Sequence, residues 1–149
     1  MPISIMLMGV GFNLGNAYIN GRYLFELSGG YAEHWLTDWR FITGAVIFLA
    51  GYITNRWADA KLRSLRRPGE LDYKIPQGGL FRWVSCPNYL GEILEWGGWA
   101  MATWSLPGLA FAFWTFANLA PRAFTHHAWY QRNFPEYPKE RRALIPWVF

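Results

Sequence analysis

The chain alternates between long runs without a charged side chain and shorter segments in which charges gather. Residues 1–21 contain no Asp, Glu, Lys or Arg, and neither do residues 41–55 or 96–121. A helical run of about 20 apolar residues is long enough to cross a bilayer, because each residue adds about 1.5 Å. The pattern therefore predicts helices that span a membrane.

The third uncharged run contains the sequence SLPG at 105–108, which interrupts it. A Leu-Pro-Gly sequence favours a tight turn between two helices over a single kinked helix. Two spans need roughly 40 residues, so both helices must recruit flanking residues. We predict four spans, a loop at 60–82 and a tail at 130–149, with the spans at about 2–21, 38–58, 83–104 and 107–129.

Composition and charge support a multi-pass, all-α membrane protein. Charged residues make up only 16% of the chain, against about 25% in an average soluble domain. The net charge is +4, and the excess of Lys and Arg lies in segments 56–82 and 122–149, whereas segment 22–40 is slightly acidic. The positive-inside rule places the two basic segments in the cytoplasm. The basic charge therefore reflects the orientation of the chain in the membrane, and nucleic acid is not an expected partner.

Glycine and cysteine positions limit the chemistry. Gly11 and Gly15 form a GxxxG pair that favours close helix packing over a phosphate-binding loop, since no strand precedes them. Cys86 is the only cysteine, which excludes an intrachain disulfide. No His or Cys partners occur at ligand spacing, so we expect no metal site.

Three polar stripes interrupt the apolar helices. They consist of Asn88, Glu92 and Glu95 beside Trp96 and Trp99; of Asn118, Arg122, His126 and Tyr130; and of Asn55, Asp59, Arg63 and Arg66. Residues three or four apart share one face of a helix. Polar groups within a span are costly unless they meet a partner or a wet cavity. We predict one polar pocket, open to the cytoplasm, whose arginine-rich mouth suits a phosphorylated cofactor; structural ion pairs and snorkelling helix ends are the alternative.

Several motifs resemble the steroid 5-alpha-reductases (3-oxo-5-alpha-steroid 4-dehydrogenases). The specific ones are RRPGE…YKIPQGGLF at 66–81, NYLGE at 88–92 and the terminal ALIPWVF, and the likeness covers essentially the whole chain. It implies a seven-helix membrane bundle, with residues 1–149 as its C-terminal domain of four helices. It also implies NADPH-dependent reduction of the 4,5 double bond of 3-oxo-steroids or a similar enone lipid, in the endoplasmic reticulum of a eukaryote or the inner membrane of a bacterium.

The resemblance also implies roles for individual residues. The implied cofactor-binding residues are Asn55, Asp59, Arg66, Tyr73, Lys74, Asn88, Glu92, His126 and Tyr130. The residues implied at the nicotinamide or substrate end are Trp96, Asn118 and Leu119. Lys74 stands where an Arg is usual, and Asn118 stands where some relatives have Phe.

The same likeness places the catalytic groups outside this chain. In the family a Gln–Glu pair and a Tyr polarise the ketone, and they belong to earlier helices. We therefore expect little or no catalysis from the 149 residues alone, and we expect those helices, as a separate chain, to be a partner.

Other functions agree with parts of the pattern. Sterol reductases that act on ring double bonds share a form of NYLGE. Related membrane methyltransferases usually have Arg where Ser85 stands, which disfavours that function. A non-catalytic scaffold or cofactor-binding fragment is an alternative of another class, and the buried polar stripes argue against a pure scaffold.

Overall fold

The computed structural model describes residues 2–65 and 73–148. Its helices are α1 (Ile3–Arg22), η1 (Tyr23–Leu27), η2 (Trp35–Thr37), α2 (Trp39–Ser64), η3 (Gly79–Arg82), α3 (Pro87–Thr103) and α4 (Leu106–Asn133). The described residues form no β-strand and only one isolated parallel bridge, between Val84 and Arg142. The prediction of an all-α fold with four long helices is confirmed.

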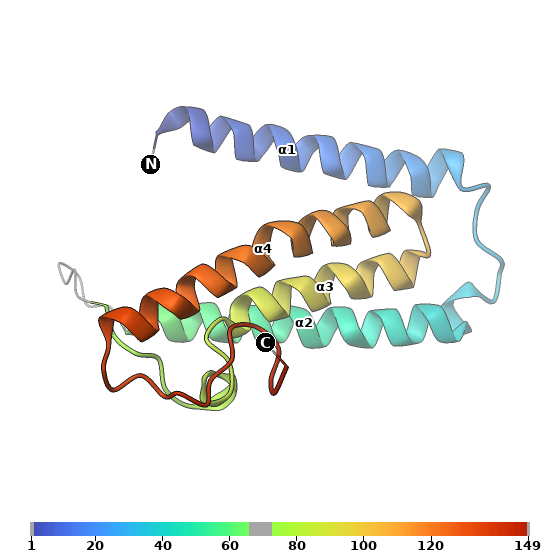
Figure 1. The fold of residues 1–149 in the computed structure, drawn as a ribbon. Coiled ribbons are helices and arrows are strands. Elements are labelled where there is room, and N and C mark those ends of the chain that lie inside the picture. The colour runs from blue at the N-terminus through green and yellow to red at the C-terminus, as the bar shows by residue number, and fades with distance from the viewer. Residues whose placement is uncertain (1, 66–72, 149) are drawn as a thin grey trace.

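Figure 1 shows α2, α3 and α4 side by side, with α3 between the other two. α1 follows the outer side of α4 and diverges from it toward the N-terminus. The tail after α4 folds back to the segment that precedes α3. The end of α2, the start of α3 and the C-terminal tail therefore meet at one end of the bundle.

Glycines allow the backbones of α2 and α3 to touch. A Cβ atom added at Gly44 would lie 2.3 Å from the backbone N of Ala102, and one added at Gly98 would lie 2.3 Å from that of Phe48. Gly51 and Gly91 meet the opposite helix in the same way, with closest backbone distances of 2.3 and 2.5 Å. In each helix the two glycines are seven residues apart, the repeat of helices that wrap around each other with a left-handed twist.

A tight turn joins α3 to α4. Trp104 adopts a left-handed conformation with φ of 45° after the last residue of α3. The Ser105 hydroxyl oxygen then accepts a hydrogen bond from the Gly108 backbone N–H at 3.1 Å, which caps α4, and proline occupies its first turn, a position that suits it. The predicted break at SLPG is confirmed.

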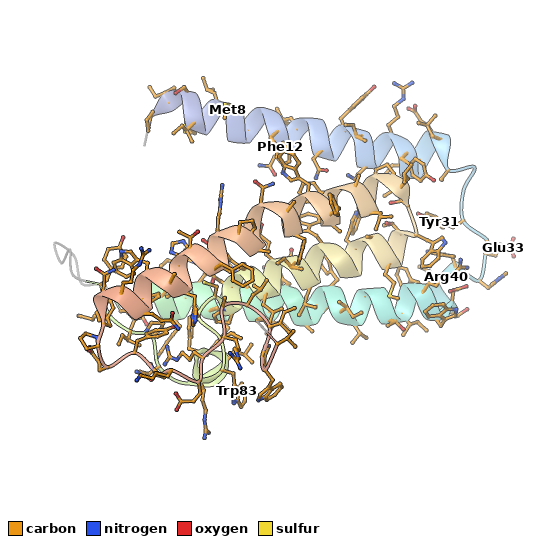
Figure 2. All side chains as sticks on the ribbon, in the orientation of Figure 1. Met8, Phe12, Tyr31, Glu33, Arg40 and Trp83 are labelled. Atoms are coloured by element: carbon orange, nitrogen blue, oxygen red, sulfur yellow. The ribbon has the colours of Figure 1, made fainter. Side chains whose placement is uncertain are left out.

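Aromatic side chains fix the other end of α2 against this turn. The Tyr31 hydroxyl donates to the Thr103 carbonyl at 2.5 Å, and its ring stacks on that of Trp35 at 4.9 Å. The Arg40 guanidinium lies 4.6 Å from the Trp35 ring centroid and 5.1 Å from that of Trp104. Figure 2 shows Tyr31 and Arg40 together at this end.

Asp38 caps α2 and pairs with Arg40. It accepts the Arg40 backbone N–H at 2.9 Å and two guanidinium hydrogen bonds at 2.9 Å each. These hydrogen bonds lower the pKa of Asp38 to about 2. The cap therefore stays ionised, and α2 keeps its N-terminal partner over the whole neutral range.

α1 packs loosely, and the predicted glycine packing in it is wrong. A Cβ added at Gly11 or Gly15 would meet nothing within 4 Å. A cavity of about 350 Å³ separates this part of α1 from α4. Phe12 spans the gap, with its ring 5.9 Å from Phe111 and 5.7 Å from Trp114, as Figure 2 shows. The large Phe12 side chain holds the backbones apart, so the small residues beside it cannot bring them together.

The expectation of four membrane spans is not met by the helices themselves. Within residues 2–65 and 73–148, no helix combines the length and the apolar character needed to cross a membrane. Asn13, Asn16 and Asn20 follow one another along α1, and α2 and α4 run past the expected span ends to Ser64 and Asn133. Polar side chains and charged helix ends lower the hydropathy of segments that lack charge in the middle.

The glycine contact predicts opposite effects for two adjacent alanine substitutions. Gly98→Ala inserts a methyl group against the Phe48 backbone, and overpacking of this kind costs about 1–3 kcal/mol or more. Gly97→Ala adds a methyl group where nothing lies within 4 Å, and alanine favours a helix by about 0.5–1 kcal/mol over glycine. Thermal unfolding should show a lower Tm for Gly98→Ala and an equal or higher Tm for Gly97→Ala. Equal Tm changes for the two variants would contradict the backbone contact.

Candidate functional site

A cavity of about 400 Å³ lies where the end of α2, the start of α3 and the last turns of α4 meet. Its lining residues are Asp59, Leu62, Arg63, Leu65, Tyr73, Lys74, Ser85, Cys86, Asn88, Tyr89, His126 and Tyr130. They come from three helices and from the connection between α2 and α3. The site therefore depends on the packing of those helices.

Hydrogen bonds between α2 and α3 shape one wall. The Asn55 side-chain amide donates to the Asn88 backbone carbonyl at 3.1 Å. The Asn88 amide in turn donates to the Asp59 carboxylate at 3.3 Å. Asp59 and Asn88 are half-buried and line the cavity, and the hydrogen-bonding capacity they retain suits the recognition of hydroxyl groups.

Positive charge gathers at the mouth. Arg63 and Lys74 line the cavity and are exposed to solvent. The Arg63 Nε donates to the Asp59 backbone carbonyl at 3.3 Å. α3 begins at Pro87 beside the cavity, and the positive end of its helix dipole favours an anion there. The mouth therefore suits a phosphate group.

Aromatic rings form the remaining wall. The Tyr89 hydroxyl and the His126 Nε2 are 3.3 Å apart, and Tyr73 meets the Trp129 ring edge to face at 4.9 Å. A neighbouring cavity of about 290 Å³ shares Tyr73, His126 and Tyr130 with the main one. Such surfaces can pack against planar rings.

The structure brings together most of the predicted cofactor residues. Six of them line the cavity: Asp59, Tyr73, Lys74, Asn88, His126 and Tyr130. Asn55 lies one hydrogen bond away. Arg66 falls outside the described residues. The predicted convergence of the three polar stripes is confirmed for Asp59, Asn88, His126 and Tyr130. Tyr73 and Lys74 come from the loop, and the role of all these residues in binding stays a prediction.

Glu92 lies outside the lining of this cavity. It is half-buried one turn further along α3, and its carboxylate interacts electrostatically with Asp59 and Arg122. Glu95 lies one turn further along the helix and interacts electrostatically with Glu92. This part of the stripe therefore forms a cluster of acidic residues separate from the cavity lining.

The three residues predicted at the substrate end do not line the cavity either. The Trp96 ring meets Phe111 edge to face at 4.5 Å. The Asn118 amide donates to the Trp114 carbonyl of its own helix at 2.9 Å, and Leu119 is buried. Their contact with a substrate stays a prediction.

Sequence reasoning missed several lining residues. Ser85 and Cys86 precede α3, Tyr89 lies within its first turn, and Leu62 and Leu65 follow the polar stripe of α2. Their position within three residues of Asn88 or of Arg63 in the sequence was the available signal. Among the described residues, no group of three or more His, Cys, Asp or Glu could hold a metal ion.

Known proteins resemble the chain along its whole length. The family model described as 3-oxo-5-alpha-steroid 4-dehydrogenase matches residues 1–149. Human 3-oxo-5-alpha-steroid 4-dehydrogenase 2 is 50% identical over 148 residues, which cover 99% of this chain and 58% of the human protein. 3-Oxo-5-alpha-steroid 4-dehydrogenase 1 of Macaca fascicularis is 49% identical over 149 residues, 100% of this chain and 56% of that protein.

A plant protein shows the same relationship. A steroid 5-alpha-reductase of Gossypium hirsutum is 46% identical over 149 residues, which cover 99% of this chain and 58% of that protein. The resemblance inferred from the sequence motifs is confirmed. The chain spans less than two thirds of the length of these relatives.

The polar wall predicts a difference between two asparagines. Asn88→Ala removes the hydrogen bond to Asp59 and should lower the free energy of unfolding by about 1 kcal/mol. Asn118→Ala is the control, because its amide bonds only to a carbonyl one turn earlier in the same helix and its loss should change stability little. Chemical denaturation measures both, and an Asn88→Ala variant as stable as Asn118→Ala would rule out a contribution from this bond.

Proposed function

The chain belongs to the 3-oxo-5-alpha-steroid 4-dehydrogenase family, and we propose that it forms the dinucleotide-binding part of an enzyme that reduces the 4,5 double bond of 3-oxo-steroids with NADPH. The observation that carries the proposal is the cavity in which Asp59, Lys74, Asn88 and Tyr130 converge from separate elements. The names of the relatives support a steroid as the substrate and an oxidoreductase as the activity.

The charges at the cavity fit the phosphates of a dinucleotide. Arg63 and Lys74 offer positive side chains at the mouth, and guanidinium groups bind phosphate through paired hydrogen bonds. α3 begins beside the cavity, and the positive end of its helix dipole favours an anion there. An extra phosphate distinguishes NADPH from NADH, so these cations would favour the phosphorylated form.

The uncharged lining fits the rest of the molecule. Asp59 and Asn88 can accept from and donate to ribose hydroxyl groups, since both face the cavity. Tyr89 and Tyr130 offer aromatic faces for a base, and stacking on an aromatic ring tolerates any planar heterocycle. The combination of cations, hydroxyl-binding groups and aromatic walls is the set that a dinucleotide needs.

The protein's own part in the reaction is to bind and orient. NADPH, when bound, supplies the hydride that adds to the carbon beta to the ketone. Negative charge then develops on the ketone oxygen, and a hydrogen-bond donor must stabilise it. The resemblance places those donors in helices that precede this chain in the family, so we assign the cavity residues to binding. Glu92 interacts electrostatically with Asp59 and Arg122, and we assign it no proton transfer.

We further propose that the protein works in a membrane, with the cavity facing the cytoplasm. The proposal rests on the surface of the helices: large apolar side chains are exposed along α1, among them Ile3, Leu7, Met8 and Leu14. Exposed basic side chains such as Arg63 and Lys74 lie instead at the end of the bundle that holds the cavity. The basic segments there match the positive-inside rule.

The proposal predicts unequal effects for two arginines. Arg63 lines the cavity, and Arg132 does not; each donates through Nε to a backbone carbonyl four residues earlier in its helix, at 3.3 and 3.2 Å. Arg63→Gln should weaken NADPH binding about tenfold, because a hydrogen bond to a charged group contributes about 1.5–3 kcal/mol. Arg132→Gln should leave the affinity unchanged.

NADPH fluorescence titration of the purified chain in detergent micelles measures both affinities. Adding the N-terminal part of a relative as a second chain, with an enone steroid, then tests reduction through the loss of NADPH absorbance. No NADPH binding by the wild-type chain would overturn the proposed function. Full turnover by the chain alone would overturn the division of roles.

A further inference from the structure

The C-terminal tail is built into the wall of the candidate site. The Ser85 backbone N–H donates to the Arg142 carbonyl at 2.8 Å, and the Arg142 N–H donates to the Trp83 carbonyl at 2.8 Å. The Cys86 N–H donates to the Ala143 carbonyl at 3.2 Å. Ser85 and Cys86 both line the cavity, so the tail holds the segment that carries them.

The Ser85 hydroxyl is buried and is the centre of a hydrogen-bond network. Its Oγ lies 2.6 Å from the His127 Nδ1, 2.6 Å from the Tyr137 hydroxyl and 3.2 Å from the Arg142 carbonyl oxygen. Gln131 completes the network, with its Nε2 at 2.8 Å from the His127 Nε2. These residues join α4 and the tail to the segment before α3.

The chemistry of the groups assigns each proton. The Arg142 carbonyl can only accept, so the Ser85 hydroxyl donates to it, and the Gln131 amide nitrogen can only donate, so the His127 Nε2 accepts. A neutral His127 then carries its proton on Nδ1 and donates to Ser85, as the Tyr137 hydroxyl also does. Each of these groups has a partner, and the Tyr137 hydroxyl has one fixed direction.

The Tyr137 ring connects this network to the cavity. It stacks on the Tyr130 ring with centroids 5.2 Å apart and planes 14° apart, and Tyr130 lines both cavities at the site. The Arg141 guanidinium lies 5.0 Å from the Tyr137 centroid. Tyr137 and Arg141 are only 4% and 2% exposed, so the Tyr137 ring has little room to shift.

The Arg141 guanidinium makes few polar contacts. Its Nη2 donates to the Gln77 Oε1 at 3.1 Å, whereas its Nε and Nη1 have no hydrogen-bond partner. Contact with the aromatic ring therefore provides much of its stabilisation, because a desolvated cation over a ring is attracted to it strongly. The guanidinium in turn confines the ring of Tyr137.

We propose that Tyr137 is a positioning residue for the dinucleotide, and that its hydroxyl, held by Ser85, fixes the ring against which Tyr130 rests in the cavity wall. The inference rests on the proposed function, since it requires Tyr130 to contact NADPH. It assigns to the tail a role in affinity, although Tyr137 itself does not line the cavity.

Tyr137→Phe tests the proposal, because it removes the hydroxyl and keeps the ring. We expect the Kd for NADPH to rise about fivefold, the change that corresponds to one lost hydrogen bond. Tyr31→Phe is the matched control: it also removes a hydroxyl that bonds across the fold, to the Thr103 carbonyl, but at the other end of the bundle. Its Kd should equal that of the wild type even where its Tm falls equally.

A double-mutant cycle separates positioning from general destabilisation. In a Tyr130→Ala background, Tyr137→Phe should leave the NADPH Kd unchanged, because the residue through which it acts is gone. A further loss of affinity in that background would show a structural effect and overturn the proposal. If Tyr137→Phe does not fold, Ser85→Ala replaces it, with the same expected rise and the same cycle.

The outcomes also separate this proposal from the proposed function. A wild-type chain that binds NADPH, together with a Tyr137→Phe variant of equal affinity, overturns the positioning role alone. A wild-type chain that does not bind NADPH overturns both.

Discussion

The backbone contact between α2 and α3 is the constraint on which the rest of the structure depends. Gly44, Gly51, Gly91 and Gly98 let the two helices approach until each backbone touches the other. Gly91 faces the Asn55 backbone, and the Asn55 side chain bonds to Asn88 one turn away. The polar wall of the cavity therefore exists only because no side chain separates the helices at that point.

The two ends of the bundle have different chemistry. At one end, Tyr31, Trp35 and Arg40 close the fold around the α3–α4 turn with rings and one guanidinium. At the other, Arg63 and Lys74 leave positive charge exposed beside a cavity. One end therefore combines stacked rings with an Asp38–Arg40 ion pair, and the other leaves cations exposed beside a cavity.

Local patterns predicted the elements and the convergence of the polar stripes. The uncharged runs and the SLPG turn indicated four helices, and the spacing of four placed Asp59, Asn88, His126 and Tyr130 on faces that do meet. These features follow from helix geometry, because the spacing of residues in the sequence determines which side chains share one face of a helix.

Contacts between distant segments were not predictable in the same way. GxxxG at Gly11 and Gly15 suggested close packing, but the motif does not identify the opposite surface, and there Phe12 holds the helices apart. The bond between Ser85 and Tyr137 joins residues 52 positions apart, and no periodicity relates a tail to the start of a helix. Roles in binding are a further step, since placement beside a cavity does not identify what the cavity holds.

The two glycine pairs also determine the alignment of α2 with α3. Gly44 lies opposite Gly98, and Gly51 lies opposite Gly91. Sliding one helix by seven residues, about 10.5 Å, would match only one pair and force the other glycines against side chains. A single pair of facing glycines would permit several registers of similar energy, whereas two pairs permit one. The glycines therefore also determine where each polar group along the interface lies.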